Sequence, residues 1–318
     1  MKRKAHANRG VNDDLNSRIR PLAWSAAALI LLLMTAVPAL NVPAVFLLAV
    51  PFTVLCVTLK PMLFAAHAAV ILFLASLLVG PAILLVGLFF LIPAVAMGYF
   101  YRRRAPARTV MTAGGAAMLA LFLLELLFLS TFLDVNLTEV LAEVIRGNAE
   151  RLEAQGMLAP GWDDEMTEAL TASVIQSLPR MLILAAFTFA VVTHWLSRRA
   201  LARAGLDVPA FRRAREWMLP RALVYVYLAV LVLYMIQLTA GSPADRSYFA
   251  MIIVNLYHLI WFAFACQTIG FFFYLAHQKG WHRIVPLLLS VPVLLFQPLS
   301  LIGVFDTAFP LRKSIGKS

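Results

Sequence analysis

Polar and ionisable side chains inside otherwise apolar segments are the residues of this sequence that could do chemistry. Glu125 lies within the apolar run 109–133, and Asn255 and His258 lie within the apolar run 248–275. Asn255 and His258 are three residues apart, so they share one face of a helix. An ionisable group in hydrocarbon is costly, and it is therefore a candidate for function by default.

The spacing of these residues indicates a common depth. At a rise of about 1.5 Å per residue, Glu125, Asn255 and His258 lie roughly 10–15 Å below the outer surface of a membrane. We therefore predict a polar pocket that opens outward, with Glu125 as an anion or proton acceptor and Asn255 and His258 as orienting groups. Tyr257 and Trp261 would supply its aromatic walls. The alternative is that these side chains only form hydrogen bonds between helices, as Asn and His often do in bundles.

Three further polar residues are expected to have structural roles. Gln267 lies deeper in the same apolar run and is predicted to tie helices together. Asp306 and Arg312 are predicted to form an ion pair that fixes the C-terminal turn. The two cysteines, Cys56 and Cys266, lie in apolar runs without the spacing of a metal or redox site.

Motifs of common catalytic sites are missing from the sequence. It contains no G-x-x-x-x-G-K-[ST] loop for a nucleotide, no H-E-x-x-H and no G-x-S-x-G. We therefore predict a protein that is not an enzyme and that has no cofactor and no metal. Any transport would depend on an energy source outside this chain.

The composition indicates which elements carry these residues. Hydrophobic residues make up 62% of the 318 positions and charged residues 14%, against about 45–50% and about 25% in soluble domains. An all-α, polytopic transmembrane helix bundle is therefore predicted. The net charge of +11 lies in short arginine clusters between apolar runs. We interpret these clusters as topology signals and predict no nucleic acid partner.

Nine apolar segments have a length close to that of a membrane span. They are predicted at about 22–40, 42–59, 61–79, 81–101, 109–133, 178–197, 220–239, 248–275 and 284–304. Most basic residues then lie on one side, which the positive-inside rule assigns to the cytoplasm. We therefore expect a bacterial cytoplasmic (inner) membrane protein with a cytoplasmic N-terminus.

The last segment leaves two topologies open. Pro286, Pro292 and Pro298 interrupt the run 284–304, and each proline frees a backbone carbonyl that hydrocarbon cannot satisfy. The run is either a ninth span or a re-entrant hairpin that returns the C-terminus to the cytoplasm. The sequence therefore predicts eight or nine crossings.

The predicted layout has two segments outside the membrane. Residues 134–177 form an acidic extracytoplasmic loop, in which apolar residues at helical spacing predict one amphipathic helix and Asp163 and Asp164 a second helix start. Residues 198–219 form a cytoplasmic amphipathic segment with a predicted helix at 208–218. The complete layout is a basic N-terminus at 1–21, helices at 22–133, the loop at 134–177, helices at 178–304 and a tail at 305–318.

Partners follow from this layout. The lipid bilayer is one partner. A protein partner through 134–177 or 198–219, and a homo-oligomer, are the others that we consider. The alternatives are a loop that only connects two spans and a segment that only anchors the chain at the lipid headgroups.

The last third of the chain resembles the YybS-like membrane proteins, the DUF2232 family. The residues that carry the resemblance are Val208-Pro209-Ala210-Phe211, Glu216-Trp217-Met218-Leu219-Pro220-Arg221, Asn255, Gln267, Gly303-Val304-Phe305-Asp306 and Phe309-Pro310-Leu311-Arg312-Lys313. The family usually has Gln followed by Gly, whereas this chain has Gln267-Thr268 with Gly270 further on. The resemblance implies a polytopic membrane protein without an established activity. Its hydropathy layout is similar to that of the S-components of energy-coupling-factor transporters, which capture substrate within the membrane.

Two functions remain open on this basis. The first is a small-molecule-binding, S-component-like subunit that works with a separate energising complex. The alternative is a non-enzymatic scaffold or regulatory protein of envelope or signalling complexes. An independent secondary transporter would show internal repeats, and no convincing repeat relates the two halves of the sequence.

Overall fold

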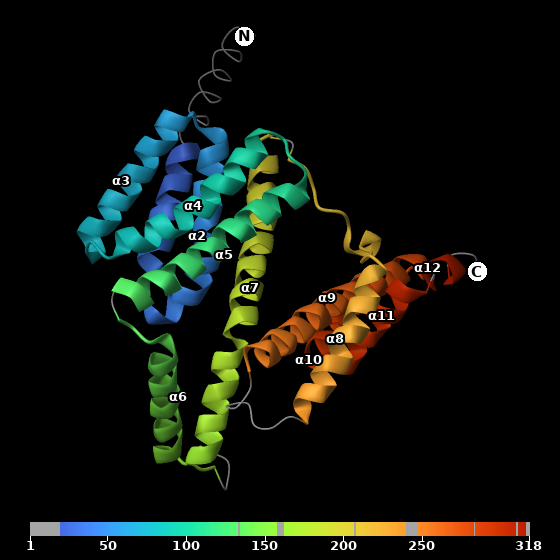
Figure 1. Ribbon diagram of the computed structural model, residues 1–318. Helices are drawn as coiled ribbons and strands as arrows, with labels where there is room; N and C mark the ends of the chain where they lie inside the picture. Colours follow the sequence, from blue (N-terminus) through green and yellow to red (C-terminus); the bar gives the residue numbers. More distant parts are fainter. Residues whose placement is uncertain are drawn as a thin grey trace. The chain divides into compact units, whose positions relative to one another are not determined.

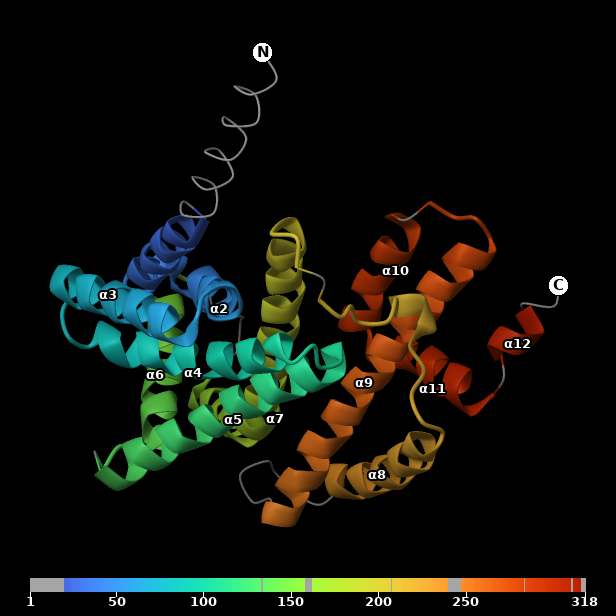
Figure 2. The same ribbon diagram turned by 90° about the horizontal axis from the view of Figure 1, so that it is seen from above.

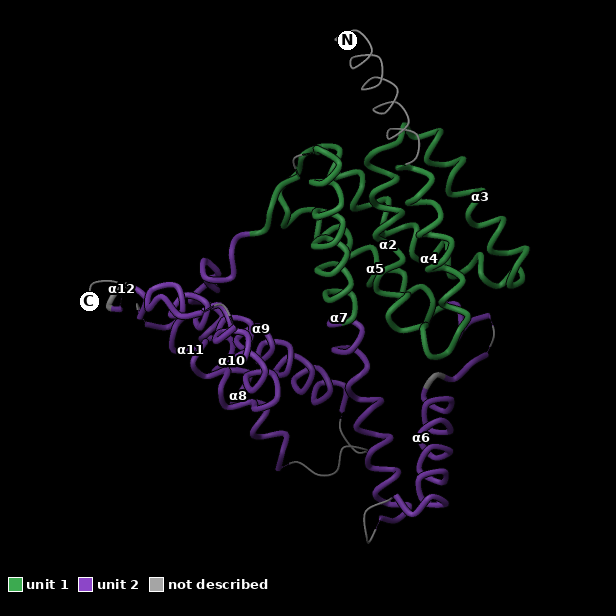
Figure 3. Tube along the Cα trace, turned by 180° about the vertical axis from the view of Figure 1, so that it is seen from behind, with its two compact units in different colours: residues 1–127, 185–211 green, residues 128–184, 212–318 purple. Residues whose placement is uncertain are grey.

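A computed structural model describes residues 20–132, 134–157, 162–206, 208–239, 247–282, 284–309 and 311–315 (Figure 1). All regular elements in these ranges are helices. Most of the predicted basic N-terminus lies outside them. The chain divides into two compact units, residues 1–127 with 185–211 and residues 128–184 with 212–318 (Figure 3).

Most of the helices are suited to a membrane. Among the described residues, six helices are long and apolar enough to cross one, or seven if a bent pair forms a single span. The six are α2 (Pro38–Thr58), α3 (Pro61–Val79), α4 (Ile83–Arg102), α5 (Ala107–Phe132), α7 (Asp164–Arg203) and α9 (Tyr248–Gln278). Two shorter apolar helices are Arg20–Met34 and α8 (Ala222–Leu238). The prediction of an all-α polytopic membrane protein is confirmed.

The first unit packs α2 closely against α4. A Cβ atom added at Gly98 would lie 2.6 Å from the Cys56 sulfur, so the glycine is what lets the two helices approach. Arg102 at the end of α4 donates hydrogen bonds to the carbonyls of Cys56 and Leu59. These carbonyls belong to the last turn of α2 and its cap, where a helix leaves acceptors unsatisfied.

The first predicted segment, 22–40, proves too long. The helix ends at Met34, and α2 begins at Pro38 with a proline in its first turn. A proline lacks a backbone N–H and disfavours helix in the residue before it, so it suits the start of a helix far better than the interior.

The second unit contains the helices of the predicted acidic loop. Helix α6 (Leu137–Ala154) is capped by Asn136, whose side chain accepts a hydrogen bond from the Thr138 N–H at 3.1 Å. The α7 N-terminus is capped by Asp163, which accepts from the Met166 N–H at 2.8 Å. Helix α7 is continuous over 40 residues, so the predicted boundary at 177 falls inside one helix.

The predicted amphipathic helix at 208–218 is wrong. Only Ala214–Glu216 form a short 3-10 helix, η1, and the residues beside it are extended. We call residues 212–221 the strap. Pro209 and Pro220 disfavour helix in the residues before them. In addition, backbone groups of the strap bond to side chains of other elements, as described below, which replaces the hydrogen bonds of a helix.

Helix α9 is the central helix of the rest of this unit, beside α8, α10 (Ile284–Leu295) and α11 (Leu301–Ala308) (Figure 2). The pair formed by α10 and the stretch Gln297–Ala308 bends by 119°. The turn contains the short helix η3 (Gln297–Ser300), and α12 (Leu311–Ile315) ends the described chain.

Contacts along α9 show the course of this bent pair. The bonded pairs, in order along α9, are Trp261 with Gln297, Gln267 with Asp306, Thr268 with Gly303 and Tyr274 with Arg312. The second leg therefore runs in the same direction as α9, toward its end at Gln278. The first leg starts just after that end and packs along α9 in the opposite direction. Both open ends of the hairpin lie at the same end of α9.

Candidate functional site

Three of the five residues predicted to bind a ligand belong to one cluster on α9, and a fourth lies beside it. Here the α9 cluster means Tyr227 and Tyr234 of α8, Tyr257, His258 and Trp261 of α9, and Gln297 at the hairpin turn; Asn255 lies beside it. The ring of Tyr234 stacks on that of Tyr257, with centroids 4.1 Å apart and planes 9° apart. The His258 ring meets both edge-on, at 5.8 Å from Tyr234 and 5.3 Å from Tyr257.

The hairpin turn is bonded directly to this cluster. The side-chain amide of Gln297 donates to the Tyr257 hydroxyl at 3.0 Å. The indole N–H of Trp261 donates to the Gln297 backbone carbonyl, also at 3.0 Å. Polar backbone at membrane depth must be satisfied by protein or water. These two bonds place the turn at the level of Tyr257 and Trp261.

The imidazole of His258 has one nitrogen in use. Nδ1 lies 2.7 Å from the Val254 carbonyl oxygen, which can only accept, so Nδ1 carries the proton. Nε2 is then a hydrogen-bond acceptor, and it bonds to no described residue. His258 is therefore held in place by the backbone while it presents an acceptor.

Asn255 connects α9 to α7 next to Pro179. Its amide oxygen accepts from the Arg180 N–H at 3.3 Å, and its amide nitrogen donates to the Gln176 carbonyl at 2.8 Å. Those two backbone groups are separated by four residues, the spacing at which a regular helix bonds them to each other. The buried amide of Asn255 thus fastens α9 to the stretch of α7 that a proline weakens.

Arg180 brings a positive charge close to the cluster. Its guanidinium interacts electrostatically with Tyr234 and with His258. The side chain is partly buried, and among the described residues it forms no ion pair with a carboxylate. This arginine was not among the predicted site residues. In the sequence it stands near one end of the apolar run 178–197, a position where arginine commonly serves as an interfacial anchor.

Glu125, the fifth predicted residue, belongs to the other compact unit. It belongs to the unit formed by residues 1–127 with 185–211, and its side chain is exposed on α5. Within the second unit, the charged neighbour of His258 is Arg180. The shared outward pocket of Glu125 with Asn255 and His258 stays a prediction.

A second polar centre lies further along α9 at Gln267. We call Gln267, Asp306 and Arg312 the buried node; their side chains are almost entirely removed from solvent. The Gln267 amide donates to Asp306 at 2.6 Å, and Arg312 donates to both oxygens of Asp306 at 2.6–3.1 Å. Such bidentate, charge-assisted bonds are among the strongest in proteins.

The buried node also holds the strap. Gln267 accepts from the Leu219 N–H at 3.1 Å, and Arg312 donates to the Arg215 carbonyl at 2.7 Å. Gly270 permits the close approach, because a Cβ atom there would lie 2.9 Å from the Ala214 carbonyl oxygen. Helix α9 is thereby bonded to the second leg of the hairpin near both of its ends, and it is also bonded to the strap.

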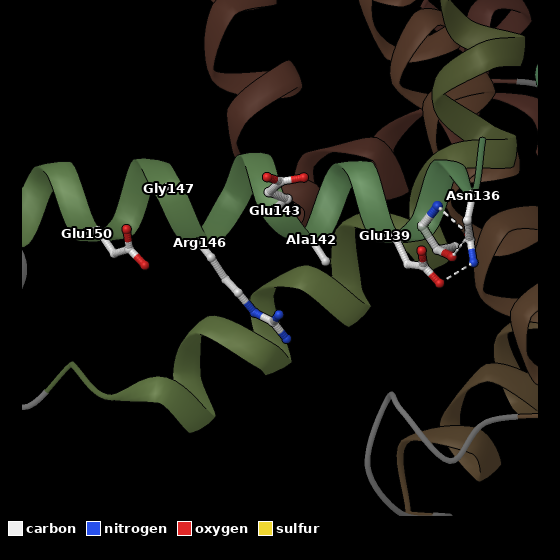
Figure 4. Close-up of a pocket in the computed structure, with 8 residues that line it drawn as sticks. Asn136, Glu139, Ala142, Glu143, Arg146, Gly147 and Glu150 are labelled. Atoms are coloured by element: carbon white, nitrogen blue, oxygen red, sulfur yellow. Dashed lines mark hydrogen bonds between the residues drawn. The ribbon is translucent and has the colours of Figure 1, made fainter. Parts of the chain in front are cut away.

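An open groove lies along α6, outside the apolar part of the chain. Its volume is about 620 Å³, and its lining consists of Asn136, Thr138, Glu139, Ala142, Glu143, Arg146, Gly147 and Glu150. Figure 4 shows these side chains along α6, with Arg146 extended away from the helix. Arg146 lies 3.8 Å from Glu168 of α7, and both side chains are more than half exposed. The groove is acidic and solvated, without the aromatic lining of the α9 cluster.

Metal-binding residues do not gather anywhere in the described ranges. No group of three or more His, Cys, Asp or Glu residues suited to a metal ion occurs in the described ranges. The polar sites in the described part of the second unit are therefore the α9 cluster, the buried node and the groove on α6.

Comparison with known proteins agrees with the membrane architecture. A family model described as "Predicted membrane protein (DUF2232)" matches residues 25–307. The "Uncharacterized protein YybS" of Bacillus subtilis (strain 168) is 24% identical over 238 residues, which cover 70% of this chain and 72% of that protein. No solved structure matches the chain significantly. The resemblance noted in the sequence is confirmed: the protein belongs to the DUF2232 family of predicted membrane proteins.

Proposed function

We propose that the protein is a non-enzymatic, ligand-binding subunit of a larger membrane assembly, with the α9 cluster as its ligand site. In this proposal a separate complex supplies the energy. The chain would resemble the S-components of energy-coupling-factor transporters in role.

The observation that carries the proposal is the hairpin turn at the α9 cluster. Irregular backbone at membrane depth is tolerated where protein buries it or where it lines a water-filled cavity. In transporters, interrupted helices surround the substrate site for this reason. Here Gln297 bonds to Tyr257 and Trp261 at the turn between two short helices. Aromatic walls, a free imidazole nitrogen and a nearby arginine are the groups that a polar organic ligand requires.

The buried node supports a link to a separate complex. Helix α9 runs without a break from Tyr257 to Gln267, about 15 Å at 1.5 Å per residue. The strap is bonded to Gln267 and to Arg312, so a displacement of α9 by a ligand would be transmitted to the strap. Arg212 and Arg213 of the strap are exposed and are not part of the buried node. They suit contact with an acidic surface of a partner protein.

The test is affinity purification of the full-length protein from native membranes. We expect a transporter ATPase module to co-purify with the wild type. The double variant Arg212→Glu/Arg213→Glu should reduce its recovery by at least about tenfold, because like charges then face each other across the contact. Arg151→Glu, at an exposed position near the end of α6, is the matched control and should leave recovery unchanged. Recovery of envelope or signalling proteins without an ATPase module would refute the proposal.

The groove on α6 favours a second candidate, a scaffold or regulatory protein of envelope or signalling complexes. The groove is acidic, and Val140 and Val144 on the same helix are 43% and 54% exposed. Charge beside exposed apolar surface is typical of a protein contact. If the protein is such a scaffold, Glu139→Lys/Glu143→Lys should abolish co-purification of an envelope or signalling protein. The strap variant Arg212→Glu/Arg213→Glu should leave that co-purification unchanged.

A further inference from the structure

The arginine beside the α9 cluster lacks a compensating charge within the described chain. Arg180 is partly buried, and its electrostatic neighbours are Tyr234 and His258. Neither is an anion at neutral pH in its ordinary state. An arginine within or at the border of an apolar layer is costly unless an anion or water accompanies it. Any countercharge that Arg180 binds therefore comes from a group outside the described chain.

The position of Arg180 is fixed by the backbone. Its N–H is bonded to Asn255, eight residues after Ser247, the N-cap of α9, which corresponds to about 12 Å along the helix. Asn255 is buried, and its amide also holds the Gln176 carbonyl. The guanidinium therefore extends from an anchored stretch of α7, which lowers the entropy lost when it binds a ligand.

The groups around Arg180 indicate the chemistry of that ligand. A guanidinium can donate two parallel hydrogen bonds to the oxygens of a phosphate. His258 presents Nε2 as an acceptor, which suits a hydroxyl group on the same ligand. Helix α8, which carries Tyr234, also has exposed apolar side chains, among them Val232, Met235 and Ile236 at 55–59% exposure. Such surface suits contact with the acyl chains of lipids.

We propose that Arg180 and His258 form the recognition site for a phosphate ester that carries a free hydroxyl group, either an anionic lipid headgroup or a soluble organic phosphate. The guanidinium binds the phosphate oxygens, and His258 Nε2 accepts the hydroxyl proton in a hydrogen bond. The rings of Tyr234 and Tyr257 contact the His258 ring edge-on and shield that side of the site from water. This inference rests on the proposed function, because it names the ligand class of the same cluster.

The experiment uses the purified full-length protein in nanodiscs of dioleoylphosphatidylcholine. Brominated phosphatidylglycerol is titrated in, and quenching of tryptophan fluorescence is compared with quenching by brominated phosphatidylcholine. Trp261→Phe identifies the part of the signal that comes from the cluster. We expect brominated phosphatidylglycerol to quench that part at a mole fraction at least about tenfold lower than brominated phosphatidylcholine does. A hydrogen-bonded charge pair typically changes affinity by that factor or more.

Variants separate recognition of phosphate from folding. Arg180→Gln should remove the preference for phosphatidylglycerol. Arg180→Lys should retain part of it, because lysine keeps the positive charge but lacks the two parallel N–H donors of the guanidinium. His258→Phe keeps a ring and loses the acceptor, and it should weaken binding about fivefold. Arg151→Gln is the control and should behave as the wild type. If Arg180→Gln fails to fold, Arg180→Lys and His258→Phe still decide the question.

A second titration distinguishes the two sources of phosphate. Glycerol 3-phosphate is added to the protein, and the shift of the thermal unfolding midpoint is recorded for the wild type and Arg180→Gln. A shift that needs Arg180 assigns the site to a soluble phosphate, and selective quenching by phosphatidylglycerol assigns it to a lipid. The absence of both effects would overturn the inference. Neither titration depends on a partner, so recovery of the ATPase module tests the proposed function independently.

Discussion

Replacing Arg312 by methionine should be among the most destabilising single changes in the second unit. The Arg312 side chain is 12% exposed, and Asp306 is fully buried. The Arg312 guanidinium donates to both carboxylate oxygens and to the Arg215 carbonyl. Arg312→Met would leave the Asp306 charge buried with only the Gln267 amide as a partner. Breaking a buried pair in this way costs about 3–5 kcal/mol.

The double variant Asp306→Leu/Arg312→Met provides the comparison. It removes both charges, so no unpaired ion remains, and apolar replacements of a buried pair are often neutral or stabilising. We therefore expect the double variant to be more stable than Arg312→Met by about 2 kcal/mol or more. Asp306→Leu alone should also be destabilised, because it leaves the guanidinium of Arg312 buried without its partner.

The assay is equilibrium unfolding of the full-length protein in mixed micelles, followed by tryptophan fluorescence. Limited trypsin digestion should report the strap separately, since Arg312→Met frees the Arg215 carbonyl and loosens the strap, which should speed cleavage at its arginines. If Arg312→Met and the double variant lose the same free energy of unfolding, the reasoning about an uncompensated buried charge is wrong. If Arg312→Met costs less than about 1 kcal/mol, the pair is worth no more than an exposed one.

Two further predictions concern close packing and the link between helices. Gly303→Ala should destabilise by about 1–3 kcal/mol, since its Cβ would lie 2.3 Å from the Phe264 carbonyl oxygen. Gly147→Ala, in open space on α6, should instead stabilise by about 0.5–1 kcal/mol, and unfolding of both variants in micelles checks the opposite signs. Asn255→Leu should cost about 1–3 kcal/mol, because the backbone groups of Gln176 and Arg180 beside Pro179 lose their bonds to the Asn255 amide. Hydrogen exchange should then increase in α7 around Pro179, and an unchanged rate there would contradict the role given to Asn255.

Much of the helical framework could be predicted from the sequence because its causes are local. Apolar runs of span length, the caps Asn136 and Asp163 and the helical spacing in α6 all act within a few residues. The strap could not be predicted in this way. Its amphipathic pattern favours a helix, but Gln267 and Arg312, far away in sequence, bond to its backbone groups and hold it extended.

The candidate site was predicted only in part for a related reason. Asn255, Tyr257, His258 and Trp261 share one helix, so their spacing reveals that they lie near each other. Gln297 and Arg180 reach the same region from other elements, and one sequence without an alignment holds no signal for such contacts. Asn255 bonds between helices, as the structural alternative expected, while His258 keeps an unused acceptor.

The bond between Arg312 and the Arg215 carbonyl also sets an order for biogenesis. The two residues are 97 positions apart, so the ribosome completes the strap long before it reaches the arginine that fastens it. Until Arg312 is made, the strap lacks its bond at the Arg215 carbonyl and can be held only through Gln267 of α9, and Asp306 emerges before its countercharge. A translation arrest or a truncation before Arg312 would therefore leave a loose, arginine-rich segment that membrane-protein quality control could recognise and degrade.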